Sequence, residues 1–113
     1  MRKNKCIILL PTEYNDGTAV PENVIAGVKR KIDEAFDGHT VAGVNQGAFR
    51  MADGTMQYER TLEIWVAVAP DRIGELKELA RKLARTLKQE SIWFEVTNSQ
   101  VEFVGPDEDG GIE

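Results

Sequence analysis

Residues 57–69, QYERTLEIWVAVA, alternate between an apolar and a mixed set of side chains. The apolar set is Leu62, Ile64, Val66 and Val68, and the mixed set is Thr61, Glu63, Trp65 and Ala67. Successive side chains of a strand point to opposite faces, so this stretch predicts a strand with one face on a core and one outside it. The chain has 113 residues, 42% hydrophobic and 29% charged, which is typical of one globular domain.

Three further elements are predicted before this strand. Residues 5–11, KCIILLP, are a continuous apolar run, which is typical of a central strand buried on both faces. Pro21 opens a helix whose apolar side chains recur at every fourth position as far as Phe36, and Gly38 is expected to supply its left-handed cap. Residues 39–51 predict an interrupted strand, followed by a turn at Asp53-Gly54.

The C-terminal half completes the pattern with a helix from Pro70 to about Gln89, and SIWFEV and VEFV then predict two strands. The order is β-α-β-β-α-β with a short extra C-terminal strand. This order predicts an α+β ferredoxin-like sandwich, in which an antiparallel sheet packs two helices on one face. Residues 1–104 are expected to form a single domain. The flexible acidic tail is expected at 105–113 and carries Asp107, Glu108, Asp109 and Glu113.

The sheet face without helices is the expected functional surface. Strand alternation places Trp65, Glu63, Trp93 and Glu95 there, together with either Cys6, Ile8 and Leu10 or Ile7 and Leu9. A large exposed apolar patch usually marks an interface, so we expect a homodimer through this face. The alternative is that the loop TEYNDGTAV or the tail folds back and covers the patch.

The glycine-rich stretch 38–54, GHTVAGVNQGAFRMADG, contains neither a phosphate-binding nor a dinucleotide-binding motif. Glycine within a strand commonly marks a bulge or bend, so a long bent hairpin is expected. Its outer part, with Gly47, Phe49, Arg50 and Tyr58, is alternatively a flap over a small ligand or a protein partner.

Residues capable of chemistry are few. His39 is the only histidine, and Cys6 is the only cysteine and lies in the apolar run. The sequence therefore predicts no metal site, no cofactor and no disulfide. Glu59, His39 and Tyr58 are the candidate acid-base residues if the chain is an enzyme.

Charge and the lack of apolar segments narrow the choice of partners. The net charge is −5 and the isoelectric point is about 4.9, which disfavours binding to nucleic acid. A membrane span needs about 20 apolar residues, and a signal core needs about 7–15, whereas the first apolar run stops at Pro11. With a single cysteine, these features predict a cytoplasmic protein without a membrane partner.

The segments DGTAVP, FDGHTVAGVNQGAFR, ADGTMQYERT and WFEV together resemble small bacterial ferredoxin-like domains of unknown function. The resemblance spans about two-thirds of the chain and falls on Gly38, Thr40, Val41, Gly47, Phe49 and Glu59, with Phe49 where such domains often have tryptophan. It implies the fold, and a shared structural or binding role for Gly47, Phe49 and Glu59, without implying an activity.

Two functions follow from the sequence as hypotheses. The first is a non-enzymatic, dimer-forming module that binds a partner protein or a small ligand. The second is a small enzyme with a pocket at the dimer interface, in which Glu59, His39 and Tyr58 exchange protons.

Overall fold

The computed structural model describes residues 2–108 and 111–112. In chain order the elements are β1 (Lys3–Pro11), α1 (Glu22–Phe36), β2 (Thr40–Arg50), β3 (Met56–Val68), the short 3₁₀ helix η1 (Pro70–Arg72), α2 (Ile73–Thr86) and β4 (Phe94–Val101). The strands form one antiparallel sheet in the order β2-β3-β1-β4. The predicted α+β class, with an antiparallel sheet and two helices, is confirmed.

The apolar run of β1 lies inside the sheet, because β3 pairs with one of its sides and β4 with the other. Cys6, Ile8 and Leu10 are fully buried. Ile7 and Leu9 are half-buried and, by strand alternation, point to the opposite face. The structure thus decides between the two sets of β1 side chains that the sequence left open.

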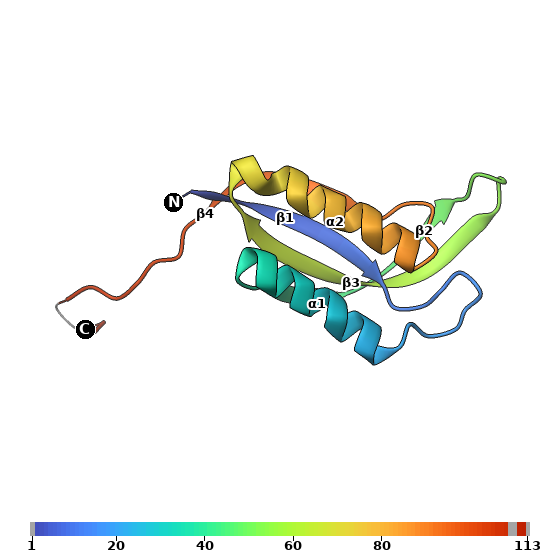
Figure 1. The fold of residues 1–113 in the computed structure, drawn as a ribbon, viewed down its shortest axis with the longest axis horizontal. Helices are drawn as coiled ribbons and strands as arrows, with labels where there is room; N and C mark the ends of the chain where they lie inside the picture. Colours follow the sequence, from blue (N-terminus) through green and yellow to red (C-terminus); the bar gives the residue numbers. More distant parts are fainter. Residues whose placement is uncertain (1, 109–110, 113) are drawn as a thin grey trace.

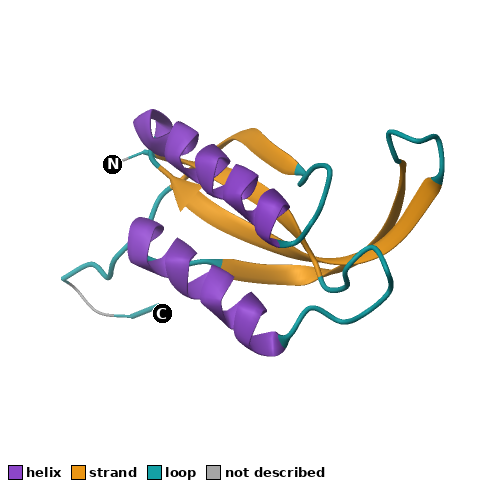
Figure 2. Ribbon diagram, turned by 45° about the vertical axis from the view of Figure 1, so that its right-hand side comes forward, coloured by secondary structure: helices purple, strands orange, loops and turns teal. Residues whose placement is uncertain are grey.

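Both helices lie on the same face of the sheet (Figures 1 and 2). The buried helical side chains are those of the predicted stripes: Val28, Ile32 and Phe36 from α1, and Leu76, Ala80 and Leu83 from α2. Most of them join Cys6, Ile8 and Leu10 in one hydrophobic core. Within the described chain, neither helix combines the length and the apolar character needed to cross a membrane.

The left-handed residue that follows helix α1 comes one position earlier than predicted. Asp37, not Gly38, adopts the left-handed conformation, with φ 68°, and its N–H donates to the carbonyl of Asp33 at 2.9 Å. Aspartate is one of the few residues other than glycine that adopt this conformation readily. The prediction that Gly38 caps the helix is therefore wrong.

The C-terminal strand also differs from the prediction. A single strand, β4 (Phe94–Val101), begins at the fourth residue of SIWFEV and continues to the first residue of VEFV, and residues 102–104 form no extra strand. The polar residues 97–100, TNSQ, which separate the two predicted strands and are typical of a turn, lie at a register shift next to Asn4, whose side-chain Nδ2 donates to the carbonyl of Thr97 at 3.1 Å. A bulge absorbs these residues without ending the strand.

The glycine-rich stretch is the first arm of a long hairpin. β2 pairs with β3 from Thr40 opposite Trp65 to Arg50 opposite Met56, with a register shift at Gly43. The predicted bend is therefore present. The hairpin runs beyond the rest of the sheet and curls at its tip (Figure 1), where Gly54 has φ 91°.

Beyond β4, residues 102–107 form neither helix nor strand, and the chain leads away from the sheet (Figure 1). Asp107 and Glu108 of the predicted acidic tail lie in the described part. Asp109 and Glu113 lie outside the described residues.

Candidate functional site

Strand register places the predicted interface residues together on the face opposite the helices. Trp65 of β3, Ile7 of β1 and Glu95 of β4 form one row across the sheet. In the next row Glu63 pairs with Leu9, whose N–H donates to the carbonyl of Trp93 at 3.2 Å. Paired residues of neighbouring strands point to the same face. We call this surface the open sheet face and define it by Lys5, Ile7, Leu9, Glu63, Trp65, Trp93 and Glu95.

Each tryptophan on the open sheet face donates to a carboxylate two residues away along the chain: Trp65 within β3, and Trp93 just before β4. Trp65 Nε1 lies 2.6 Å from Glu63 Oε2, and Trp93 Nε1 lies 3.1 Å from Glu95 Oε1. In the row of Ile7 the tryptophan comes from the β3 side and the glutamate from the β4 side, and in the row of Leu9 this order is reversed. The two tryptophans therefore lie diagonally across β1 from each other. Ile7 and Leu9 fill the space between them.

Lys5 belongs to this face, although the sequence analysis did not single it out. Its Nζ lies 4.0 Å from the centre of the Trp65 ring, within the range of a cation–π interaction. Hydrogen bonds from Asn45 and Trp65, with the charge of Lys5, lower the pKa of Glu63. The alternation along β1 could have predicted this position, because it directs Lys3 and Lys5 to the same face as Ile7 and Leu9.

Neither segment that was expected as an alternative cover lies over the centre of the open sheet face. The loop after β1 packs against the core on the helix side, through Tyr14 and the buried Val20. The C-terminal segment leads away from the sheet (Figure 1). Trp93 accordingly keeps 61% of its surface exposed, whereas Trp65 is half-buried.

Glu59 lies on the same sheet face, nearer the hairpin, opposite Gly47. Two hollows of about 240 and 430 Å³ are both lined by Gln46, Gly47 and Glu59. The Oε2 atom of Glu59 is shut off from solvent and accepts no hydrogen bond from any described residue. Burial raises the pKa of this carboxyl group. A partly buried carboxyl group beside a hollow is suited to acid-base chemistry or to binding a hydrogen-bond donor.

The other two candidate acid-base residues differ in their relation to Glu59. Tyr58 lines the smaller hollow together with Glu59, although it is 75% exposed and strand alternation directs its side chain toward the helix side. His39 lies at the other end of the hairpin, because the next residue, Thr40, pairs with Trp65. Trp65 is six residues along β3 from Glu59, which at about 3.3 Å per residue separates the two positions by about 20 Å. His39 Nδ1 is hydrogen-bonded to Asp33 at 2.5 Å. The structure therefore does not unite Glu59, His39 and Tyr58 in one site.

The remaining predicted residues lie at the outer end of the hairpin. Phe49 is half-buried opposite Gln57, and Arg50 Nη1 donates to the carbonyl of Gly54 at 2.7 Å. Arg50 thus stabilises the turn. At the tip, the Ala52 N–H donates to the carboxylate of Glu90, in the connection between α2 and β4, at 3.1 Å.

Cys6 is buried in the core, and burial raises the pKa of its thiol. This environment is that of an inert structural cysteine. Among the described residues, no group of three or more His, Cys, Asp and Glu side chains converges in a way that would hold a metal ion.

Comparison with known proteins finds no matching family model and no matching curated protein. Among solved structures, the chain is similar to a phage SAM lyase in complex with S-methyl-5′-thioadenosine. The TM-score is 0.67 at 14% sequence identity, and the alignment covers 91% of this chain and 90% of the lyase chain. At this identity the similarity concerns the fold alone.

Proposed function

We propose that the chain is a self-associating module whose open sheet face is the interface between two copies. The observation that carries this proposal is the pair of tryptophans, Trp65 and Trp93, on a face that no helix covers. A patch of this kind on a single chain usually marks an interaction surface.

The polar atoms of this face support burial against a second copy. Both indole N–H groups already donate to carboxylates, so contact with a partner leaves neither donor unsatisfied. Glu63 also accepts a hydrogen bond from Asn45 Nδ2 at 2.9 Å, and Lys5 supplies a nearby positive charge. Glu95 belongs to the edge strand β4, where it can remain in contact with water at the rim.

Burial of the open sheet face favours association. Burying the exposed part of one Trp93 ring contributes about 3 kcal/mol, at roughly 25 cal/mol per Å². In a two-fold symmetric dimer each contact occurs twice, so burial of Trp93, Trp65, Ile7 and Leu9 acts against an association cost of about 4–15 kcal/mol.

Light scattering over a range of protein concentrations tests the interface. The wild-type protein is expected to reach twice the chain mass of 12.6 kDa, and Trp93→Asp is expected to remain at the chain mass. The matched control is Tyr58→Asp, which puts the same charge on an exposed aromatic residue of the helix side and leaves the dimer intact. A wild-type protein that stays monomeric at the highest concentration would contradict the proposal.

A second candidate function is binding, or acid-base chemistry on, a small molecule at Glu59. The specific observation is its Oε2 atom, which is shut off from solvent, accepts no hydrogen bond from a described residue and belongs to a side chain that lines two hollows. The solved structure of similar fold contains a nucleoside thioether, S-methyl-5′-thioadenosine, which is therefore the first compound to test.

Thermal unfolding with and without S-methyl-5′-thioadenosine tests this second candidate. A ligand that binds only the folded protein raises Tm, and a compound at 100 times its Kd adds about 2.7 kcal/mol of stability. Glu59→Gln is expected to reduce the shift, while Trp93→Asp reports separately on whether the dimer is needed. Absence of a shift with the wild-type protein would count against this candidate.

We further propose the finer assignments that the sequence suggested. The sheet order β2-β3-β1-β4, with a helix after β1 and another after β3, supports the ferredoxin-like arrangement. The single, buried Cys6 is compatible with the reducing cytoplasm of a bacterium.

A further inference from the structure

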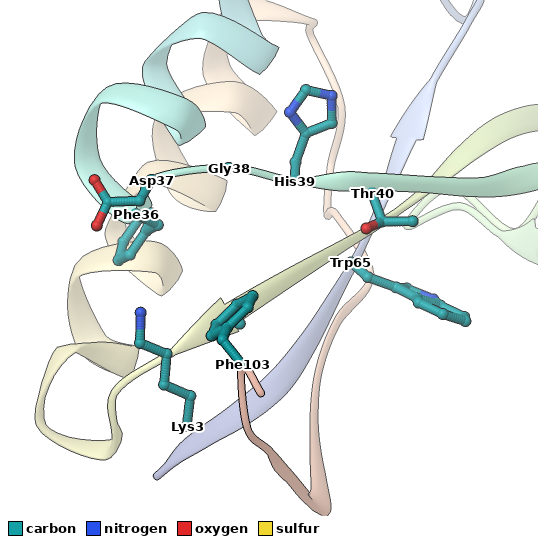
Figure 3. Close-up of a pocket in the computed structure, with 9 residues that line it drawn as sticks. Lys3, Phe36, Asp37, Gly38, His39, Thr40, Trp65 and Phe103 are labelled. Carbon is teal, nitrogen blue, oxygen red and sulfur yellow. The ribbon is translucent and has the colours of Figure 1, made fainter. Parts of the chain in front are cut away.

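A cavity of about 470 Å³ lies at the corner of the sheet where β3 ends, and we call it the corner pocket (Figure 3). Its wall combines the aromatic residues Phe36, Trp65 and Phe103 with Lys3 and the connection from α1 to β2, residues 37–40. The volume lies within the range of about 300–1,000 Å³ that is usual for small-molecule sites.

The space exists because the sheet is incomplete at this corner. β2 pairs with β3 only as far as Thr40 opposite Trp65, so the last residues of β3 have no strand neighbour on that side. Ala67, which also lines the pocket, presents only a methyl group. A bulkier residue there would fill the gap between Trp65 and Phe103.

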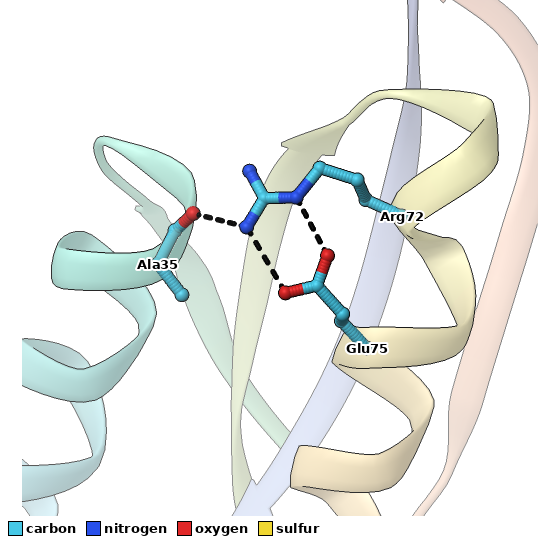
Figure 4. Close-up of polar contacts among 3 residues, drawn as sticks. All are labelled: Ala35, Arg72 and Glu75. Atoms are coloured by element: carbon cyan, nitrogen blue, oxygen red, sulfur yellow. Dashed lines mark hydrogen bonds and ion pairs between the residues drawn. The ribbon is translucent and has the colours of Figure 1, made fainter.

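The Phe36 wall is held in place by a fixed arginine. The Arg72 guanidinium lies 4.8 Å from the centre of the Phe36 ring. It donates to the Ala35 carbonyl at 2.8 Å and to both carboxylate oxygens of Glu75, at 2.7 and 3.2 Å (Figure 4). These contacts link the C-terminal end of α1 to the start of α2, so this wall is preformed.

The opposite wall is an aromatic ring whose exposure the fold does not explain. Phe103 is 76% exposed, beyond the end of β4. Lys3 Nζ lies 5.4 Å from the centre of its ring, and the ammonium group points toward the space beside Phe36 (Figure 3). Lys3 forms no ion pair with any described residue.

The charges around the corner pocket favour an anion. Lys3 is on its wall, and Lys5 lies against the adjoining Trp65 ring. The Asp37 carboxylate points away from Phe103 and Trp65, and the His39 ring lies on the far side of the connection, bonded to Asp33 (Figure 3). The positive charge of Lys3 is thus the one directed into the aromatic part of the cavity.

We propose that the corner pocket binds a planar aromatic molecule that carries a negatively charged substituent. The ring packs between Phe103 and Trp65, with the largely buried Phe36 beside it, and the anionic group pairs with the Lys3 ammonium. This site goes beyond the proposed self-association. It contains neither Trp93 nor Glu59.

Three probes separate the ring from the charge: indole-3-acetate, tryptamine and cyclohexylacetate. The first two share a ring and differ in charge, and the third keeps the carboxylate without an aromatic ring. In amide and indole NMR spectra, indole-3-acetate is expected to shift the Trp65 indole and the Gly38 and Thr40 amide signals, with a millimolar Kd. Tryptamine and cyclohexylacetate are expected to bind about tenfold more weakly or not at all.

Two variants locate the site without touching the core. Lys3→Met removes the charge and Phe103→Ala removes one wall, and each is expected to weaken indole-3-acetate binding by about tenfold. Lys77→Met, on the exposed surface of α2, and Trp93→Asp are expected to leave it unchanged. The proposal is overturned if indole-3-acetate causes no shifts, if either other probe binds equally well, or if both site variants bind like the wild type.

Discussion

Glu59 holds one carboxylate oxygen where neither solvent nor a hydrogen-bond donor of the described chain reaches it. Burial raises the pKa of Glu59, so the folded protein binds this proton more tightly than the unfolded chain does. The stability that this group contributes is fully present below its unfolded pKa of about 4.3 and is lost as the pH rises through the higher folded pKa.

Glu59→Gln is therefore expected to stabilise the protein at pH 7. Solvent screens this partly buried charge, so its removal gains less than about 1 kcal/mol, and the advantage disappears below about pH 4, where the wild-type carboxyl group is already neutral. Thermal unfolding of both proteins between pH 4 and pH 8 measures the difference.

Glu63→Gln is the matched control, two residues away on the same strand face. Hydrogen bonds from Asn45 and Trp65 lower the pKa of Glu63, so its contribution is present above the unfolded pKa and is lost as the pH falls through the folded pKa. This variant is expected to be less stable than wild type at pH 7 and equal to it in acid. If both variants change the stability at pH 7 in the same direction, burial does not determine the contribution of Glu59 to stability.

Among the elements, the hairpin of β2 and β3 has at its tip one polar contact with another part of the fold, counted over the described residues. The Ala52 N–H donates to both carboxylate oxygens of Glu90, at 3.1 and 3.3 Å, and so connects the tip to the segment before β4. Local turns, such as the hydrogen bond from the Thr55 N–H to Asp53 Oδ1 at 2.9 Å, shape the tip without fixing its position.

Glu90→Ala is expected to free the tip. Amide hydrogen exchange in residues 51–55 should become faster, because the tip then opens without breaking the sheet. The global Tm should change by no more than about 2 °C, as is usual for an exposed side chain. Glu78→Ala removes a carboxylate that pairs with Arg81 on α2 and serves as the control. Unchanged exchange in residues 51–55 would show that the tip holds its position without Glu90.

Element by element, periodicity predicted most of this fold. The alternation in β3 and the four-residue spacing in α1 both survive in the structure, because each reflects burial of one face. The predicted final strand failed because the TNSQ segment has turn-type residues, yet pairing with β1 and a bulge keep it extended. Local propensity carried no information on that pairing.

In the candidate site, too, local patterns predicted some features and long-range pairing determined the others. Alternation alone placed Trp65 with Glu63 and Trp93 with Glu95 on one face, and the register confirms that arrangement. The choice of Ile7 and Leu9 over Cys6, and the position of Lys5 against Trp65, depended on which face the helices cover. Long-range register also separated His39 from Glu59, which no local pattern revealed.

At the scale of the whole molecule, self-association and ligand binding meet at Trp65. This half-buried ring belongs to the open sheet face and also lines the corner pocket. Trp93 belongs only to the former, and Phe103 only to the latter. Substitutions at these two residues therefore separate the functions, whereas a change at Trp65 affects both.

Self-association links stability to concentration. When folded chains pair and unfolded chains do not, mass action favours the folded state as the concentration rises. For a dimer of 113-residue chains that unfolds as a unit, a tenfold increase in concentration is expected to raise Tm by about 3 °C. Trp93→Asp is expected to give a Tm that does not depend on concentration, and Tyr58→Asp is expected to keep the wild-type dependence. Calorimetry at two concentrations tenfold apart measures all three, and a wild-type Tm that stays constant between them would exclude the open sheet face as a stable dimer interface.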